Sequence, residues 1–290
     1  MPIAHPDSIE DLKEVLRNNS STVLLAGGTD FMVGLNHGSS RLENDHLIVD
    51  LRDVAELSTV ELDYHDQVLR LGAGVRWSDL LEGPVEEAAP CLSQAARTVG
   101  SHQIRTAGTI GGNIATASPA GDGVCALVAL GASVVLSSHR GQRTVAVRDF
   151  ATGPKRSVLE QHEFIERVDI PIVNGWQGYS KIGTRNAMVI SVAGAAVVLA
   201  SDTQSCQISL GSVGPTIIAA EAASSFAATA IDWERSSISS GDLNQIVTFV
   251  RDVASPIDDH RSTAAYRTHA VGVLVKRLIE QGLRAIKEPS

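Results

Sequence analysis

Two short runs of glycine with polar neighbours are the residues of this chain that could bind a ligand. The first is Ala26–Asp30, with the sequence AGGTD, and the second is Thr109–Asn113, with the sequence TIGGN, followed by Asp122. Adjacent glycines lack Cβ atoms, so anionic oxygens can approach successive backbone N–H groups. The Asn113 amide can donate a hydrogen bond, and the Asp122 carboxylate can accept one from a hydroxyl. Together the runs predict one long, phosphate-containing ligand.

The segments around the first run would position it for such a ligand. Residues 22–25 are typical of a short buried strand, and residues 31–35 of the start of a helix. A strand, a glycine pair and a helix N-terminus place backbone donors and the positive end of a helix dipole at one point. Neither run has the G-x-G-x-x-G spacing, which argues against a Rossmann nicotinamide site. A single glycine pair would favour a plain tight turn, and it is the matched second run that reverses this preference.

With both runs in place, the chain resembles the FAD-binding medium subunit of the molybdenum hydroxylases. This is the family of xanthine dehydrogenase, aerobic carbon monoxide dehydrogenase, and the nicotine and caffeine dehydrogenases. The resemblance covers the whole chain and implies an α+β protein. It implies a two-subdomain FAD-binding fold of the PCMH/vanillyl-alcohol-oxidase type, followed by a C-terminal antiparallel sheet with packed helices.

The resemblance also implies a role for each matching residue. The first run would wrap the FAD diphosphate, the second would contact its other side, and Asp122 would accept from a sugar-alcohol hydroxyl. A cation at Lys181 or Arg185 would stabilise the anionic reduced flavin, although such a pair is also typical of a solvated face. The implied cofactor-binding residues are Leu25, Ala26, Gly27, Gly28, Thr29, Asp30, Phe31, Val99, Thr109, Ile110, Gly111, Gly112, Asn113, Asp122, Lys181, Arg185 and Ile190.

Two of these positions bear on access to the flavin. Ile190 would lie against the edge of the ring and limit access to it, and Val99 would pack near the cofactor. The family often has acidic residues in the turn after its arginine, where this chain has Asn186–Met188. The flavin potential and the electron acceptor are therefore left open by the resemblance.

The family implies a heterotrimeric complex in which this chain passes electrons. A large subunit would bind the molybdopterin cofactor, a small subunit would bind [2Fe-2S] clusters, and the complex would form a dimer of heterotrimers. Electrons would pass through FAD to NAD+, a quinone or oxygen, with no acid–base catalytic residue and no metal ligand on this chain. Two alternatives are a stand-alone FAD-dependent reductase or oxidase of the same fold, and a non-catalytic nucleotide-binding interaction module.

Composition narrows the class of protein. The three cysteines are widely spaced and form no CxxC pair, so an iron–sulfur or metal site on this chain alone is not expected. A net charge of −9 disfavours nucleic acid and anionic membranes as partners. The sequence has neither an apolar run long enough to span a bilayer nor a basic, apolar signal region, which predicts a cytoplasmic protein.

The order of the expected elements predicts three units, residues 1–57, 58–173 and 174–290. The boundary before the third unit is placed in residues 171–178, where one proline and two glycines indicate a linker. Helices are expected at 8–18, 84–99, 122–130, 216–228, 243–254 and 263–286, and strands at 22–25, 46–51, 68–73, 133–136, 144–147, 164–170, 179–182, 189–199 and 206–213.

Overall fold

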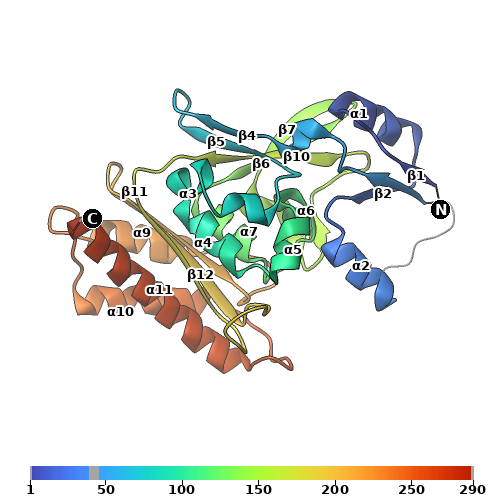
Figure 1. Cartoon of the computed structure of the whole chain (residues 1–290). Helices are drawn as coiled ribbons and strands as arrows, with labels where there is room; N and C mark the ends of the chain where they lie inside the picture. The colour runs from blue at the N-terminus through green and yellow to red at the C-terminus, as the bar shows by residue number, and fades with distance from the viewer. Residues whose placement is uncertain (1, 39–45, 289–290) are drawn as a thin grey trace.

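Three large sheets, beside a small two-stranded one, organise the computed structural model, which describes residues 2–38 and 46–288. In Figure 1 they succeed one another from the N-terminus on the right to the C-terminus on the left. Helices pack against each sheet, so the expected α+β class is confirmed. Within the described residues, no helix is both long and apolar enough to cross a membrane.

The first unit is a parallel sheet with the strand order β1-β3-β2. Helix α1 buries Leu12 and Leu16 in a core shared with Val49 and with Phe164 of the next unit. The Ser8 hydroxyl caps α1 by accepting from the Asp11 N–H. The elements are β1 (Ile3–Ala4), α1 (Ile9–Asn18), β2 (Thr22–Leu25), α2 (Thr29–Asn36), β3 (Leu47–Asp50) and the 3₁₀ helix η1 (Ala55–Ser58).

The second unit is a five-stranded antiparallel sheet in the order β4-β5-β10-β6-β7, covered by short helices. Every residue of α7 is buried, because this helix lies between the second and third units. The elements are β4 (Val60–Asp63), β5 (Val68–Gly72), η2 (Trp77–Leu80), α3 (Pro84–Ala88), α4 (Pro90–Thr98), α5 (His102–Ala107), α6 (Ile110–Ala115), α7 (Asp122–Ala129), β6 (Ser133–Ser138), β7 (Gly141–Ala146), α8 (Val147–Phe150), β8 (Ala151–Gly153), β9 (Arg156–Ser157) and β10 (Phe164–Pro171).

The third unit is a four-stranded antiparallel sheet in the order β11-β12-β13-β14. Successive side chains of a strand point to opposite faces, so Ala196 and Val198 of β12 join the core of the second unit, whereas Val197 and Leu199 pack on the C-terminal helices. Figure 1 shows β12 between α7 and α11. The elements are β11 (Gly175–Ile182), β12 (Ala193–Ala200), β13 (Ser205–Gly211), β14 (Ile218–Ala219), α9 (Glu221–Ala230), α10 (Ser240–Val253) and α11 (Ala264–Lys287).

Several expected boundaries were wrong. The single helix expected at 84–99 is two helices, because Pro90 disfavours helical backbone at Ala89, which has φ −136° and ψ 60°. The linker expected at 171–178 is mostly strand, since β10 ends at Pro171 and β11 begins at Gly175. A Cβ on Gly175 would lie 2.0 Å from the Leu199 carbonyl oxygen, so this glycine serves close strand packing.

Two further expectations in the third unit need correction. The strand expected from residue 189 begins only at Ala193, and residues 183–192 form a connection between β11 and β12. The helix expected at 216–228 begins only at Glu221, because Ile218–Ala219 pairs with β13 as a short edge strand. The connection at 183–192 proves important for the site described next.

Candidate functional site

A cleft of about 920 Å³ brings the two glycine runs together. This volume lies near the upper end of the range of about 300–1,000 Å³ for small-molecule sites. The cleft is lined by residues from all three units, including strand β2, helices α2 and α6, and the connection 183–192. Of the predicted residues, it is lined by Leu25, Ala26, Gly27, Gly28, Thr29, Asp30, Phe31, Val99, Thr109, Gly111, Gly112, Asn113, Asp122 and Ile190.

The first glycine run presents unpaired backbone donors to this cleft. Gly28 has φ +68°, a left-handed conformation that turns the chain from β2 into α2. The backbone N–H groups from Gly27 to Phe31 donate to no residue that the structure describes, and the first paired one is Met32, which donates to the Gly28 carbonyl oxygen at 2.9 Å. Unpaired N–H groups and the positive end of the α2 dipole favour an anion here.

Gly27 joins the two runs by close packing. A Cβ at this position would lie 1.9 Å from the Ala107 carbonyl oxygen and 2.8 Å from Cα of Gly108. These two residues directly precede Thr109. Gly27 is therefore required for contact with the second run, not for the approach of a ligand.

The second run corrects the expectation of an open loop with free N–H groups. Residues Ile110–Ala115 form a short helix, and the Thr109 hydroxyl caps it by accepting from the Gly112 N–H at 3.1 Å. The N–H groups of Ile110 and Gly111 donate to the carbonyl oxygens of Val75 and Ala73, and that of Asn113 donates to the carbonyl oxygen of Thr109. All four N–H groups are thus already paired within the protein.

Asn113 supplies the group in this second run that does lack a partner. Its side-chain Oδ1 is buried and accepts no hydrogen bond from the described residues. A buried amide oxygen without a donor is costly, so it indicates a hydroxyl, an N–H group or water that completes the site.

Asp122 lies at the bottom of the cleft in a buried network. Its carboxylate accepts from the Tyr179 hydroxyl at 2.7 Å and from the Lys181 ammonium at 2.5 Å. Lys181 also donates to the carbonyl oxygens of Thr98, at 2.9 Å, and Val189, at 3.1 Å. Burial raises the pKa of Asp122, and the Lys181 charge opposes that shift.

Three predicted residues do not line the cleft. Lys181 uses all three of its N–H donors within the protein, as described above. Arg185 is exposed and donates to the carbonyl oxygens of Ala187 and Met188 in its own turn. Ile110 is fully buried in the core of the second unit. None of these three side chains is therefore positioned to contact a ligand in the cleft. Ile190 does line the cleft, and 54% of its surface is exposed.

The sequence patterns missed several residues of the cleft, among them two cations. Arg76 and Lys155 both line it, and neither forms an ion pair with a described residue. Arg52 lines it as well, but its guanidinium is paired with the buried Asp50 carboxylate at 2.6 Å. The turn at Gly74 could have indicated that Arg76, which follows it, lies near a ligand. Nothing in the sequence around Lys155 indicates such a position.

The residues of the cleft fit a long anionic ligand that also carries hydroxyl groups. Unpaired N–H groups at α2 and the two unpaired cations suit a diphosphate. The orphaned Asn113 oxygen and the Asp122 carboxylate suit hydroxyl donors on the same ligand. FAD, the ligand expected from the sequence, has both kinds of group.

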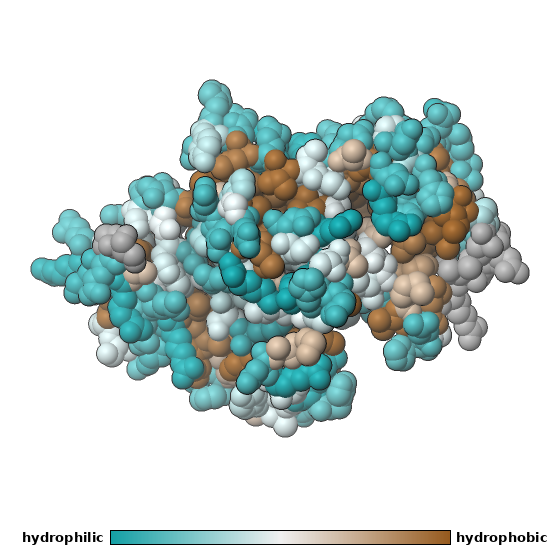
Figure 2. Space-filling model, in the orientation of Figure 1, coloured by the Kyte–Doolittle hydropathy of each residue, from teal (hydrophilic) through white to brown (hydrophobic). Residues whose placement is uncertain are grey.

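Exposed apolar side chains lie on two of the segments that contribute to the cleft. Met32 and Val33 are half-exposed on α2, and Met188 and Ile190 are half-exposed on the connection 183–192. Figure 2 shows apolar residues gathered around α2 and its neighbouring strand on the right of the view. The cleft thus combines polar anion-binding groups with the exposed apolar side chains of Met188 and Ile190.

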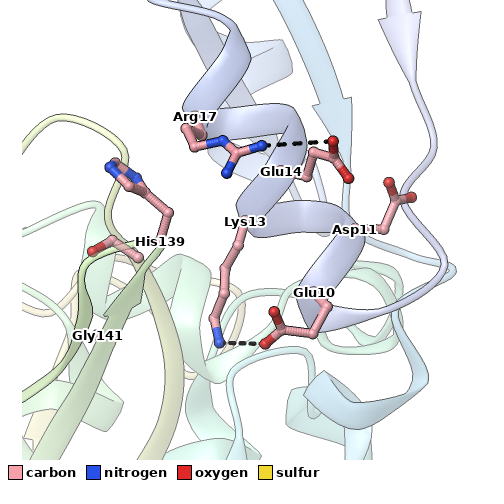
Figure 3. A pocket seen from close by; sticks show the side chains of 8 residues that line it. Glu10, Asp11, Lys13, Glu14, Arg17, His139 and Gly141 are labelled. Atoms are coloured by element: carbon pink, nitrogen blue, oxygen red, sulfur yellow. Dashed lines mark hydrogen bonds and ion pairs between the residues drawn. The ribbon is translucent and has the colours of Figure 1, made fainter.

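A second hollow, of about 490 Å³, lies between α1 and the β6–β7 turn (Figure 3). It is lined by charged side chains, but Lys13 pairs with Glu10 at 2.7 Å and Arg17 with Glu14 at 3.7 Å, both on the same helix. Its cations are therefore neutralised, and the hollow is a poorer site for an anion than the cleft between the units.

Comparison with known families agrees with this site. Residues 1–173 match the model of the FAD binding domain in molybdopterin dehydrogenase. Residues 179–281 match the model of the CO dehydrogenase flavoprotein C-terminal domain. The two matches together span nearly the whole chain.

Individual relatives are similar to this chain over most of their length. The carbon monoxide dehydrogenase medium chain of Afipia carboxidovorans is 30% identical, over 95% of this chain and 94% of the relative. The nicotinate dehydrogenase FAD-subunit of Eubacterium barkeri is 33% identical, over 68% of each chain.

Solved structures give the same result. CO dehydrogenase from Oligotropha carboxidovorans superposes with a TM-score of 0.86 at 28% identity, over 98% of both chains. Quinoline 2-oxidoreductase from Pseudomonas putida 86, at 23% identity over 99% of this chain and 98% of its own, shares the fold with a TM-score of 0.87. The chain therefore belongs to the FAD-binding medium subunits of the molybdenum hydroxylase family of oxidoreductases.

Proposed function

We propose that this chain is the electron-exit subunit of a molybdenum-containing hydroxylase or dehydrogenase. It would pass electrons from [2Fe-2S] clusters of a small partner subunit through FAD to NAD+, a quinone or oxygen. A large partner subunit would hold the molybdopterin cofactor and oxidise the substrate. Relatives named as medium chains of carbon monoxide and glyceraldehyde dehydrogenases support an assembly with larger and smaller partners.

The observation that carries this proposal is the row of unpaired N–H groups at the start of α2, in a cleft that the second run also lines. We assign the FAD diphosphate to Leu25–Phe31, with Arg76 and Lys155 adding charge. Thr109–Asn113 would form the opposite wall, and the Asn113 oxygen would accept from a hydroxyl or N–H group. These residues bind and orient the cofactor, and FAD supplies the redox chemistry.

Asp122 would accept a hydrogen bond from a cofactor hydroxyl, in keeping with its place in the cleft. Lys181, which donates to this carboxylate, would keep it charged and correctly oriented. Val99 and Ile190 would pack against the cofactor, and Ile190 would limit access to the ring edge. A direct contact of Lys181 or Arg185 with FAD stays a prediction, and it requires that their present hydrogen bonds be exchanged.

Hydrogen exchange tests the assigned binding mode. In the flavin-free chain, the amides of residues 27–31 should exchange rapidly because they have no acceptor, and FAD should slow them strongly. The amides of residues 110–113 should exchange slowly with or without FAD, because they are paired within the protein. Equal effects of FAD on both segments would contradict the assignment.

Native co-purification tests the proposed place in a complex. We expect flavin on this chain, and molybdenum and iron on two companion subunits. Light scattering would then show whether the complex is the dimer of heterotrimers expected from the sequence, and cell fractionation whether it is cytoplasmic. Turnover by the isolated chain would favour a stand-alone reductase or oxidase. A bound nucleotide that never changes redox state would favour a non-catalytic module.

A further inference from the structure

The connection 183–192 contributes residues to the cleft and forms the part of its rim that comes from the third unit. Met188, Val189 and Ile190 line the cleft, and Met188 and Ile190 are half-exposed. Met188 has φ +51°, a conformation that costs free energy in a residue other than glycine. Such a rim needs support from the residues beneath it.

That support comes from side chains that bind its backbone carbonyl oxygens in succession. Lys181 donates to Val189, Ser212 donates to Ser191 at 2.9 Å, and Arg267 donates to Val192 at 2.9 Å. Lys181 belongs to the neighbouring strand, but Arg267 lies in the first turns of α11, 75 residues away along the chain. The C-terminal helix thus reaches the rim of the cleft through one guanidinium group.

Arg267 is also linked to a second segment beside the cleft, through Ser212. Its Nη1 donates to the Ser212 carbonyl oxygen at 3.2 Å, and the Ser212 N–H donates to the Pro119 carbonyl oxygen at 2.7 Å. Pro119 lies between Ser118 and Ala120, which line the cleft ahead of Asp122. A single side chain is therefore linked by hydrogen bonds to two segments that contribute to the cleft.

The burial of Arg267 indicates that this arrangement is specific. Only 3% of the residue is exposed, and its Nη2 donates to Asp259 at 2.7 Å. The pKa of Asp259 is lowered to about 2 by a hydrogen bond from the Arg261 backbone N–H and by the hydrogen bond from the Arg267 guanidinium. The carboxylate therefore stays charged. An ion pair with one buried and one partly exposed partner stabilises little by itself compared with apolar packing, so a role in fixing geometry accounts for it better.

We propose that Arg267 is a positioning residue for the flavin site, which fixes the rim at Val192 and, through Ser212, the segment around Pro119. Asp259 orients the guanidinium and links it to the surface connection 254–263, where Ile257 is 72% exposed. Two hydrogen bonds therefore connect that surface connection to Val192, two residues beyond Ile190 of the cleft. This proposal rests on the proposed FAD site.

The test compares variants of the full chain after removal and re-addition of FAD. Arg267→Lys keeps the charge but cannot span Val192, Ser212 and Asp259 at once, and Asp259→Asn removes the orienting charge. Arg277→Lys, at an exposed position of the same helix with no ion pair to a described residue, is the matched control. The measured quantities are the dissociation constant for FAD, the visible circular dichroism of the bound flavin, and the melting temperature.

We expect Arg267→Lys to raise the dissociation constant about tenfold, the effect of losing one charge-assisted hydrogen bond, and to change the flavin dichroism. Asp259→Asn should act in the same direction, and Arg277→Lys should match the wild type. If the Arg267 and Asp259 variants melt at lower temperature but keep wild-type FAD affinity and dichroism, Arg267 is only structural and the proposal fails.

Failure of the proposed function and failure of this proposal give different results. A wild-type chain that does not bind FAD would overturn the proposed function itself. Arg267→Met is a stronger test of the same side chain, and it should weaken FAD binding more than Arg267→Lys does. If Arg267→Met does not fold, Arg267→Lys and Asp259→Asn still decide the question, because both retain a polar group at the buried position.

Discussion

The two glycine pairs of this chain look alike in sequence and do different work in the structure. At Gly27–Gly28 the backbone turns through a left-handed residue into α2, and the following N–H groups have no partner within the described residues. At Gly111–Gly112 the backbone is already helical, and every N–H group is paired. The first pair presents donors, whereas the second lets a short helix pack against the strand that ends near Ala73. Equal dipeptides thus indicate neither equal conformation nor equal function.

Gly27→Ala should have the largest effect, because it disrupts the contact between the two glycine runs. Its new Cβ would overlap the Ala107 carbonyl oxygen, and both partners are backbone, so the two runs must separate. We expect the free energy of unfolding of the flavin-free chain to fall by about 3 kcal/mol or more, and FAD binding to be lost. Denaturant unfolding and flavin titration measure both effects. Wild-type stability would show that the runs are not in contact as described.

Gly28→Ala should cost less and should affect the ligand site more selectively. An alanine at φ +68° is destabilised by about 1–2 kcal/mol, and relief of that strain would turn the N–H groups of α2 away from the cleft. Gly28→Asn is the matched variant, because asparagine tolerates left-handed backbone better. FAD should bind Gly28→Asn more tightly than Gly28→Ala. The reverse order would mean that backbone conformation is not what matters here.

Thr109→Ala tests the other side of the comparison. Loss of this helix cap should lower the free energy of unfolding by about 1 kcal/mol, since the Gly112 N–H then has no side-chain acceptor. FAD affinity should change less than it does in Gly28→Ala. Thr109→Ser keeps the hydroxyl and should be close to the wild type. If Thr109→Ala had unchanged stability but greatly reduced FAD affinity, the second run and not the first would supply the donors to FAD.

Gly112→Ala should have the smallest effect. Apart from its chain neighbours and the backbone of its own helix, the one described atom within 4 Å of its new Cβ is the Thr109 hydroxyl oxygen, at 3.0 Å. Alanine favours helix by up to about 1 kcal/mol over glycine, which offsets this close contact, so we expect a change within about 0.5 kcal/mol. Gly111→Ala is the paired control, because its Cβ would meet Ala73 at 2.5 Å and should destabilise clearly. Equal effects at the two positions would remove the distinction drawn between them.

Much of the fold could be predicted because local patterns agree with it. The capped helix at α1, the parallel pair β2 and β3, and the long C-terminal helix all lie close to where periodicity and capping residues place them. The predictions fail where contacts with residues distant in sequence decide the local structure. Gly175 and Gly178 resemble a linker but belong to β11, where they fit against Leu199 and the Trp176 ring.

The sequence alone predicted one anionic cofactor for the two glycine runs and an acidic residue, because residue types fix which groups can donate and accept. It also determined the family, since the matching motifs are specific. Tertiary structure decided which run keeps its N–H groups free and that Lys181 is bound to Asp122. It also placed Arg267, from the last helix, beneath the rim of the cleft. Hydrogen-bond partners far apart in sequence exist only once the chain has folded, so no local pattern records them.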